Sequence, residues 1–247
     1  MARPRFASIL VLITACAPPD APAAADIAQS TTTDASPSVV APADIPPDIR
    51  EDSWARLPLP RRETLDADGQ RAFDMIVSPD SRYATGLRGP AAMWVHSPLM
   101  AEHLFPFSTH LRYGTDKDQR LTELAILSTA REARSQYEWT SHEPLALQAG
   151  LEPAIIDLVK RRADLETAVG VPGLGERERT IVAFAREAMS DEKVGAETFR
   201  RAIGLFGERG VMDLAGLIGY YAFVDITLKS FDVQLAPGRE RLLPDLW

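Results

Sequence analysis

From about residue 61 onward, proline and glycine divide the chain into segments whose apolar residues recur at helical spacing. Pro98 follows Ser97, an order typical of a helix with a capped first turn, and Gly114 marks the predicted end of this helix. No segment of useful length alternates apolar and polar residues as a half-buried strand does. The sequence therefore predicts an all-α domain over residues 61–247.

Further along the chain, the same spacing predicts helices that begin after residue 116, at about residue 135 and at Pro153. Residues 211–224 are apolar nearly all round, which predicts a buried central helix. The stretch 169–175 contains two glycines, but no lysine followed by serine or threonine comes after them. We therefore interpret it as a connecting loop and not as a phosphate-binding loop.

The N-terminus has the features of a targeting segment. Two arginines precede a short apolar stretch at residues 6–15, which is too brief to span a bilayer. The tetrapeptide Ile-Thr-Ala-Cys that ends at Cys16 resembles a bacterial lipobox. We expect residues 1–16 to be a signal peptide and Cys16 to carry lipid. The alternative is an ordinary signal that is cleaved near residues 21–25.

Residues 17–60 are rich in alanine, proline, serine, threonine and aspartate. Such a segment buries too little apolar surface to offset the entropy lost on ordering, so it predicts a disordered tether. We expect an exported protein that is anchored by lipid to the bacterial cell membrane or outer membrane, on the periplasmic side. A secreted or freely periplasmic protein is the alternative, and no other membrane contact is expected.

Charge and cysteine content exclude several classes of protein. The formal net charge is −8 and no basic face is visible, which argues against nucleic acid as a partner. Cys16 is the only cysteine, so a single chain cannot form a disulfide, a zinc–cysteine site or a dithiol redox pair. With four histidines, a metal site would also need carboxylates. We expect neither a metal nor an organic cofactor.

The stretch 121–150 carries the pattern that bears most directly on function. On a helix, Glu138 and His142 lie four residues apart and share a face, and Ser135 falls on the same stripe. Glu123 lies on the preceding predicted helix and meets this stripe if the two helices pack antiparallel. The alternative is that His142 has only a structural contact with Glu138 across one helical turn.

The same stretch resembles the carboxymuconolactone decarboxylase family. The resemblance rests on Leu121–Leu127 and Gln136–His142, with Ala146 and Gly150 after them, and extends in weaker form over about residues 65–233. It implies a helical bundle of the alkylhydroperoxidase D type. It also implies a homo-oligomer, a trimer or a multiple of one.

The redox branch of this family has a glutamate, then a C-x-x-C pair, then a histidine. Glu123 and His142 match the glutamate and the histidine, whereas Ser135 and Glu138 stand where the two cysteines would be. Thiol peroxidases need a thiolate nucleophile, and a serine hydroxyl cannot cycle through a sulfenic acid or a disulfide. Redox chemistry is therefore excluded unless another chain supplies the thiols.

The resemblance then implies an acid–base site for a cofactor-free lyase of the 4-carboxymuconolactone decarboxylase type, acting on a small carboxylate or lactone. His142 is the expected proton donor, because its ordinary pKa lies near neutrality. Glu123 is expected to orient the imidazole, and Glu138 to do the same or to shape the pocket. Ser135 completes the predicted catalytic set.

Three further residues are candidates for binding the substrate. Arg131 and Arg134 are candidates because a guanidinium matches the geometry of a carboxylate, and His96 is a candidate ligand in an entry loop. Two other functions stay open: an isomerase or hydrolase on the same scaffold, and a non-catalytic binding or assembly domain. The predicted export argues against the strict decarboxylase, since catabolism of aromatic acids is cytoplasmic.

Overall fold

Helices account for most of residues 38–244, the part of the chain that the computed structural model describes. These residues belong to one of two units into which the chain divides, Ala35–Trp247. The all-α prediction is confirmed for them, whereas the predicted signal peptide, Cys16 and tether residues 17–37 lie outside the described residues. In chain order the α-helices are α1 (Ala67–Ile76), α2 (Gly89–Trp94), α3 (Pro98–Tyr113), α4 (Gln119–Glu132), α5 (Gln136–Gln148), α6 (Pro153–Lys160), α7 (Glu176–Ala188) and α8 (Ala196–Ser230).

Local signals placed several helix ends correctly. Helix α3 begins after Ser97 and ends before Gly114, as predicted, and α6 begins at Pro153. Helix α4 begins slightly later than expected, because the Asp118 side chain caps it by accepting a hydrogen bond from the Leu121 amide at 2.8 Å.

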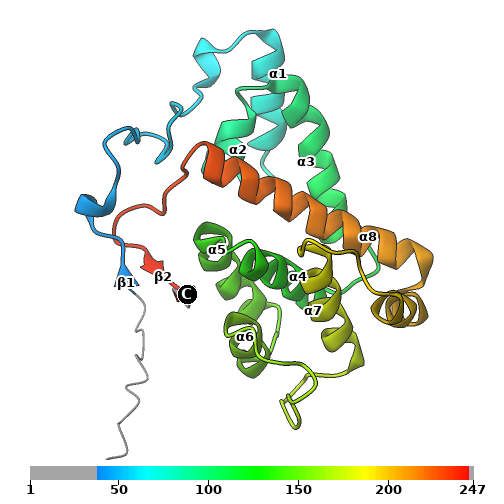
Figure 1. Ribbon diagram of the computed structural model, residues 1–247. Helices are drawn as coiled ribbons and strands as arrows, with labels where there is room; N and C mark the ends of the chain where they lie inside the picture. Colours follow the sequence, from blue (N-terminus) through cyan, green and yellow to red (C-terminus); the bar gives the residue numbers. More distant parts are fainter. Residues whose placement is uncertain (1–37, 245–247) are drawn as a thin grey trace, which may run out of the picture. The chain divides into compact units, whose positions relative to one another are not determined.

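The longest helix, α8, lies between α1–α3 on one side and α4–α7 on the other (Figure 1). Gly207 has φ 68° and ψ 175°, which interrupts the helical backbone there. Leu214 and Leu217 are fully buried, so the predicted central helix over residues 211–224 is confirmed. Helix α8 is long and apolar enough to cross a membrane, but its buried side chains belong to the core of this domain.

Helix α4 is buried over its whole middle part, because α5, α6, α7 and α8 all pack against it. Polar side chains on α4 must therefore find partners inside the protein. The hydroxyls of Ser128 and Thr129 each donate to the carbonyl four residues earlier, at 2.8 Å. Glu123 makes no such bond within α4, and its partners, Arg112 and His142, lie on α3 and α5.

The tether prediction is wrong for residues 38–60. Strand β1 (Ser38–Val39) pairs antiparallel with β2 (Glu240–Arg241), a short 3₁₀ helix follows at Pro42–Asp44, and Ala55 is fully buried. A second 3₁₀ helix, Arg62–Thr64, comes just after this stretch. The amide of Arg56 donates to a carbonyl just after α8. The composition of residues 38–60 does not reveal that they are ordered, because the residues that they contact lie near the far end of the chain.

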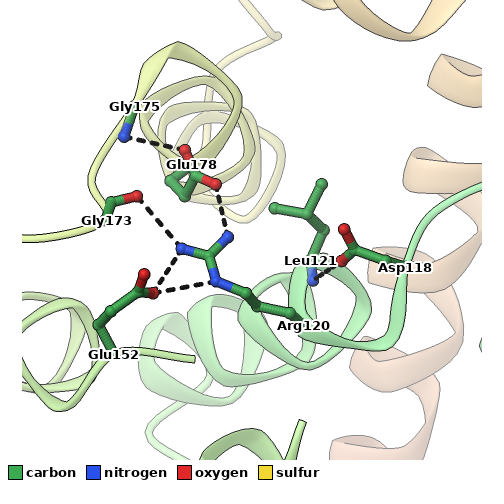
Figure 2. Close-up of polar contacts among 7 residues, drawn as sticks. All are labelled: Asp118, Arg120, Leu121, Glu152, Gly173, Gly175 and Glu178. Carbon is green, nitrogen blue, oxygen red and sulfur yellow. Dashed lines mark hydrogen bonds and ion pairs between the residues drawn. The ribbon is translucent and has the colours of Figure 1, made fainter. Parts of the chain in front are cut away.

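A half-buried arginine, Arg120, holds the predicted connecting loop against the helices around it (Figure 2). Arg120 on α4 donates from Nε to Glu152 at 3.0 Å, from Nη1 to Glu178 at 2.6 Å, and from Nη2 to the Gly173 carbonyl at 3.2 Å. Gly173 has φ +75°, and a Cβ there would collide with the Glu152 carboxyl group. We call Arg120, Glu152 and Glu178 the loop cluster.

Candidate functional site

A cavity of about 580 Å³ lies among α2, α3, α4, α5 and α8. The turn before α2 and the segment before β2 complete its wall. Its polar lining includes four arginines, two glutamates and one histidine. These charged residues are Arg82, Arg88, Arg112, Arg239, Glu123, Glu138 and His142.

Glu123 and His142 form the pair that the sequence predicted. His142 Nδ1 on α5 donates to Glu123 Oε2 on α4 at 2.7 Å, although nineteen residues separate them. The two residues are only 3% and 6% exposed. Since an ionised carboxylate can only accept, this contact fixes the hydrogen on Nδ1.

The other ring nitrogen of His142 faces the cavity wall. Nε2 lies 3.4 Å from Glu138 Oε2, one helical turn away on α5. It also lies 3.3 Å from the hydroxyl of Tyr221 on α8. Nε2 is therefore the atom from which a proton can pass to a molecule in the cavity.

Arg112, at the end of α3, holds the second oxygen of Glu123. Its Nη2 donates to Glu123 Oε1 at 3.0 Å, and both side chains are buried. The Arg112 Nε has no hydrogen-bond partner within residues 38–244. Arg112, Glu123 and His142 thus form a chain of charged contacts that ends at the cavity. We call these three residues the cavity cluster.

The cavity cluster shifts the pKa values of its members. Burial lowers the pKa of His142, but the charge of Glu123 and the hydrogen bonds of Glu123 and Glu138 outweigh it, so the pKa is raised above 6.5. Burial alone would raise the pKa of Glu123, yet His142 and Arg112 lower it below 4.5. Both shifts favour the form of the pair in which His142 is an imidazolium and Glu123 a carboxylate.

Apart from the charged residues, six of the thirteen other lining residues are aromatic. All five tyrosines of the chain line this cavity, together with one tryptophan. Burial raises the pKa of Tyr221 well above 10.0, so its hydroxyl stays protonated at neutral pH. The aromatic lining residues are Tyr83, Trp94, Tyr113, Tyr137, Tyr220 and Tyr221.

Solved structures with the same arrangement of helices show which fold this is. An uncharacterized peroxidase-related protein from Ralstonia eutropha JMP134, solved as an alkylhydroperoxidase AhpD core, superposes with a TM-score of 0.57 at 14% sequence identity. The match covers 74% of this chain and 92% of that one. The chain has the AhpD-like fold.

A second AhpD-like match is a cysteine-to-alanine variant of the debrominase Bmp8, solved in complex with 2,3,4-tribromopyrrole. Its TM-score is 0.55 at 15% identity, and the match covers 72% of this chain and 90% of that one. No protein-family model and no curated protein matches the sequence. The fold implied by the sequence resemblance is thus confirmed, and function has to be argued from the site.

Ser135 does not belong to the cavity cluster. It is the residue before α5, with an extended backbone (φ −86°, ψ 94°). Helical periodicity does not extend to a residue outside the helix, so the prediction that Ser135 shares a stripe with His142 is wrong. Ser135 lines a second, smaller cavity of about 210 Å³ instead.

The three residues predicted to bind the substrate do not line the larger cavity either. Arg131 is buried and donates from Nε to the Lys160 carbonyl at 2.6 Å, which directs it toward the end of α6. Arg134 has φ +56° in the turn after α4 and lines the smaller cavity. His96 lies 2.9 Å from the Pro58 carbonyl and helps to hold the N-terminal segment.

The arginines that do line the cavity were missed because they are far from His142 in the sequence. Arg112 ends α3, and Arg82 precedes α2. Tyr221 falls within residues 211–224, so the sequence predicted its burial in a central helix but not its place at the cavity. Nothing local in the sequence distinguishes Arg112 from a solvated surface charge.

Metal ligation was the other possible use of these carboxylates. Among the described residues, no group of three or more histidine, cysteine, aspartate and glutamate side chains is placed to hold a metal ion. The cavity cluster therefore carries its polar contacts through hydrogen bonds and ion pairs between its own side chains.

Proposed function

We propose that this protein is a cofactor-free acid–base enzyme of the carboxy-lyase type, acting on a small carboxylate or lactone. The observation that carries the proposal is the buried pair of Glu123 and His142 at the wall of the 580 Å³ cavity. A histidine with a fixed hydrogen on one nitrogen and its other nitrogen toward a cavity is arranged for proton transfer.

In the proposed reaction, the bond between the substrate ring and its carboxylate breaks and carbon dioxide leaves. As this bond breaks, His142 delivers the proton on Nε2 to the ring carbon, and the electron pair of the broken bond forms the new bond to hydrogen. Water then returns a proton to the imidazole and leaves as hydroxide. The products are carbon dioxide, hydroxide and the ring with hydrogen in place of the carboxylate, so the step needs no oxidant or reductant.

The neighbouring residues support this role for His142. Glu123 favours the imidazolium and orients the ring, while Arg112 keeps Glu123 ionised. The Tyr221 hydroxyl lies 3.3 Å from Nε2 and stays protonated, so it is placed to donate a hydrogen bond to a substrate oxygen.

The fold neighbours favour an enzyme in general and leave the reaction open. One is peroxidase-related and the other is a debrominase. Thiol chemistry does not fit this chain, because in the sequence resemblance Ser135 and Glu138 stand where the two cysteines would be and Cys16 is the only cysteine. An isomerase or hydrolase would use the same histidine, whereas a binding or assembly domain would need no turnover.

A turnover screen of the full-length chain against small lactones and carboxylates tests the proposal. The His142→Ala variant should lose any activity found. His110→Ala is a matched control, because His110 lies 3.7 Å from Asp213, outside the cavity lining. Equal activity in wild type and His142→Ala would refute the proposed role of His142.

Two further parts of the proposal concern location and assembly. We propose that the protein is exported and anchored through lipid on Cys16, and that it forms a homo-oligomer. Mass spectrometry that finds an unmodified Met1 N-terminus on intracellular protein would contradict the first. A monomer mass by light scattering at micromolar concentration would contradict the second.

A further inference from the structure

We infer that the ligand of this cavity is a flat aromatic carboxylate. The inference rests on the proposed function for the site, and it narrows the substrate class from any small carboxylate to one that carries an aromatic ring.

The first argument is the concentration of rings on one cavity. All five tyrosines of the chain line it, although they come from four separate parts of the sequence. Tyr220 makes edge contacts with Tyr221 at 5.1 Å and with Trp94 at 6.0 Å between ring centroids. Such ring clusters favour edge-on and offset contacts with a further aromatic ring.

One wall position shows how closely the backbone approaches these rings. Gly89 has φ +56°, and a Cβ on it would lie 2.3 Å from the Tyr137 hydroxyl oxygen. Any side chain at Gly89 would therefore push Tyr137 out of its place in the wall. The position of Tyr137 in the aromatic lining therefore requires glycine at residue 89.

The second argument is uncompensated positive charge. Arg82 lines the cavity, is partly buried and has no carboxylate at ion-pair distance among residues 38–244, whereas Arg88 and Arg239, which also line the cavity, are solvent-exposed. The lining holds four arginines against two glutamates, even though the whole chain has a net charge of −8. An anionic ligand balances this excess of positive charge.

Arg82 is the arginine best placed to bind a carboxylate. Its guanidinium stacks over the rings of Tyr83 and Phe105, at 4.9 and 5.6 Å from their centroids. Stacking holds the planar group in one orientation while its N–H donors stay available, which suits the two oxygens of a carboxylate. Arg82 is therefore placed to bind the carboxylate of a ligand whose ring contacts the aromatic side chains of the cavity.

Binding measurements on the full-length chain test whether the ligand needs an aromatic ring and whether it needs a negative charge. Isothermal titration calorimetry should compare 4-hydroxybenzoate with trans-4-hydroxycyclohexanecarboxylate, which lacks the aromatic ring, and with 4-hydroxybenzamide, which lacks the charge. We expect both analogues to bind at least tenfold more weakly than 4-hydroxybenzoate. Equal affinity for the saturated acid overturns the aromatic requirement, and equal affinity for the amide overturns the anionic one. No binding of 4-hydroxybenzoate overturns the inference as a whole.

A matched pair of variants locates the anionic contact. Arg82→Gln should weaken 4-hydroxybenzoate about tenfold and leave the weak binding of the amide unchanged. Arg177→Gln is the control, because Arg177 also stacks on a ring, that of Phe206 at 5.9 Å, but does not line the cavity. Equal loss in the two variants, or none in Arg82→Gln, overturns the assignment of Arg82.

These outcomes separate the inference from the proposed function. Ring-selective binding without turnover of any carboxylate supports the inference and contradicts the proposed enzyme. Turnover of saturated and aromatic acids with equal efficiency supports the enzyme and contradicts the inference.

Discussion

Two clusters of arginine and glutamate flank the start of α4, and they differ in how fully their polar groups are used. In the loop cluster, Nε, Nη1 and Nη2 of Arg120 each donate to a protein oxygen. In the cavity cluster, Arg112 Nε has no hydrogen-bond partner among residues 38–244, and His142 Nε2 has only long contacts, 3.3 Å to the Tyr221 hydroxyl and 3.4 Å to Glu138. A saturated cluster holds chain segments together, whereas an unsaturated one at a cavity has capacity left for a ligand.

The clusters also differ in solvent exposure. The side chains of Arg112, Glu123 and His142 are 3–8% exposed, whereas those of the loop cluster are 11–34% exposed. Water screens the loop cluster and weakens its charge–charge contacts. Removing one charge from the cavity cluster leaves another buried without compensation, which is the more costly change.

The largest expected effect is the loss of turnover in His142→Ala. Removing a general acid lowers kcat/KM by about 10²–10⁴-fold. Stability should change less, because Glu123 keeps its contact with Arg112. The matched change in the loop cluster, Arg120→Met, should leave kcat/KM within about twofold of wild type, well below the catalytic effect. Steady-state kinetics on both folded variants measure this difference. An equal loss of activity in the two variants would contradict the assignment of catalysis to the cavity cluster.

The next effect concerns stability. Glu123→Gln leaves the buried Arg112 without its counter-charge, so the free energy of unfolding should fall by about 3 kcal/mol. Adding Arg112→Met should restore part of this loss, because the uncompensated charge is then gone, but not turnover. Urea unfolding measures both variants. An additive further loss in the double variant would show that Arg112 and Glu123 do not act as a pair.

A smaller loss is expected in the loop cluster. Arg120→Met removes the donors to Glu152 and Glu178 and should lower the free energy of unfolding by about 2 kcal/mol. Protease cleavage within the connecting loop at residues 169–175 should become faster, because Arg120 no longer holds it through the Gly173 carbonyl. A cleavage rate equal to that of wild type would mean that the loop is held by other contacts.

The smallest effect is the pH dependence of stability. The raised pKa of His142 means that its stabilisation is fully present below 6.5 and is lost as the pH rises through the raised value. The lowered pKa of Glu123 means that its stabilisation is present above 4.5 and is lost as the pH falls through the lowered value.

The stability difference between wild type and His142→Gln should therefore shrink over the pH range from about 6.5 upward, as the pH rises through the raised pKa of His142. The difference between wild type and Arg120→Met should stay flat, since neither glutamate nor arginine titrates in that range. Urea unfolding at several pH values measures both differences. A flat His142→Gln difference would show that His142 does not carry its charge in the folded protein.

The site was partly predictable from sequence. The spacing of Glu138 and His142 within α5 depends only on helical geometry, and the pairing of Glu123 with His142 followed from the family resemblance and an antiparallel packing of two helices. Ser135 was misplaced because it lies just outside the helix. Arg131 and Arg134 were chosen for their nearness to His142 along the chain, but the arginines that reach the cavity are distant in sequence.

The sequence by itself determined the helical segments, several of their ends and the absence of a thiol pair. These properties depend on neighbouring residues or on composition alone, as at Ser97, Pro98 and Gly114. Only the tertiary structure decided that residues 38–60 are ordered and that Arg82 and Arg112 share a cavity with His142. Those facts depend on which distant segments pack together, and these contacts raise the pKa of His142 and determine which side chains line its cavity.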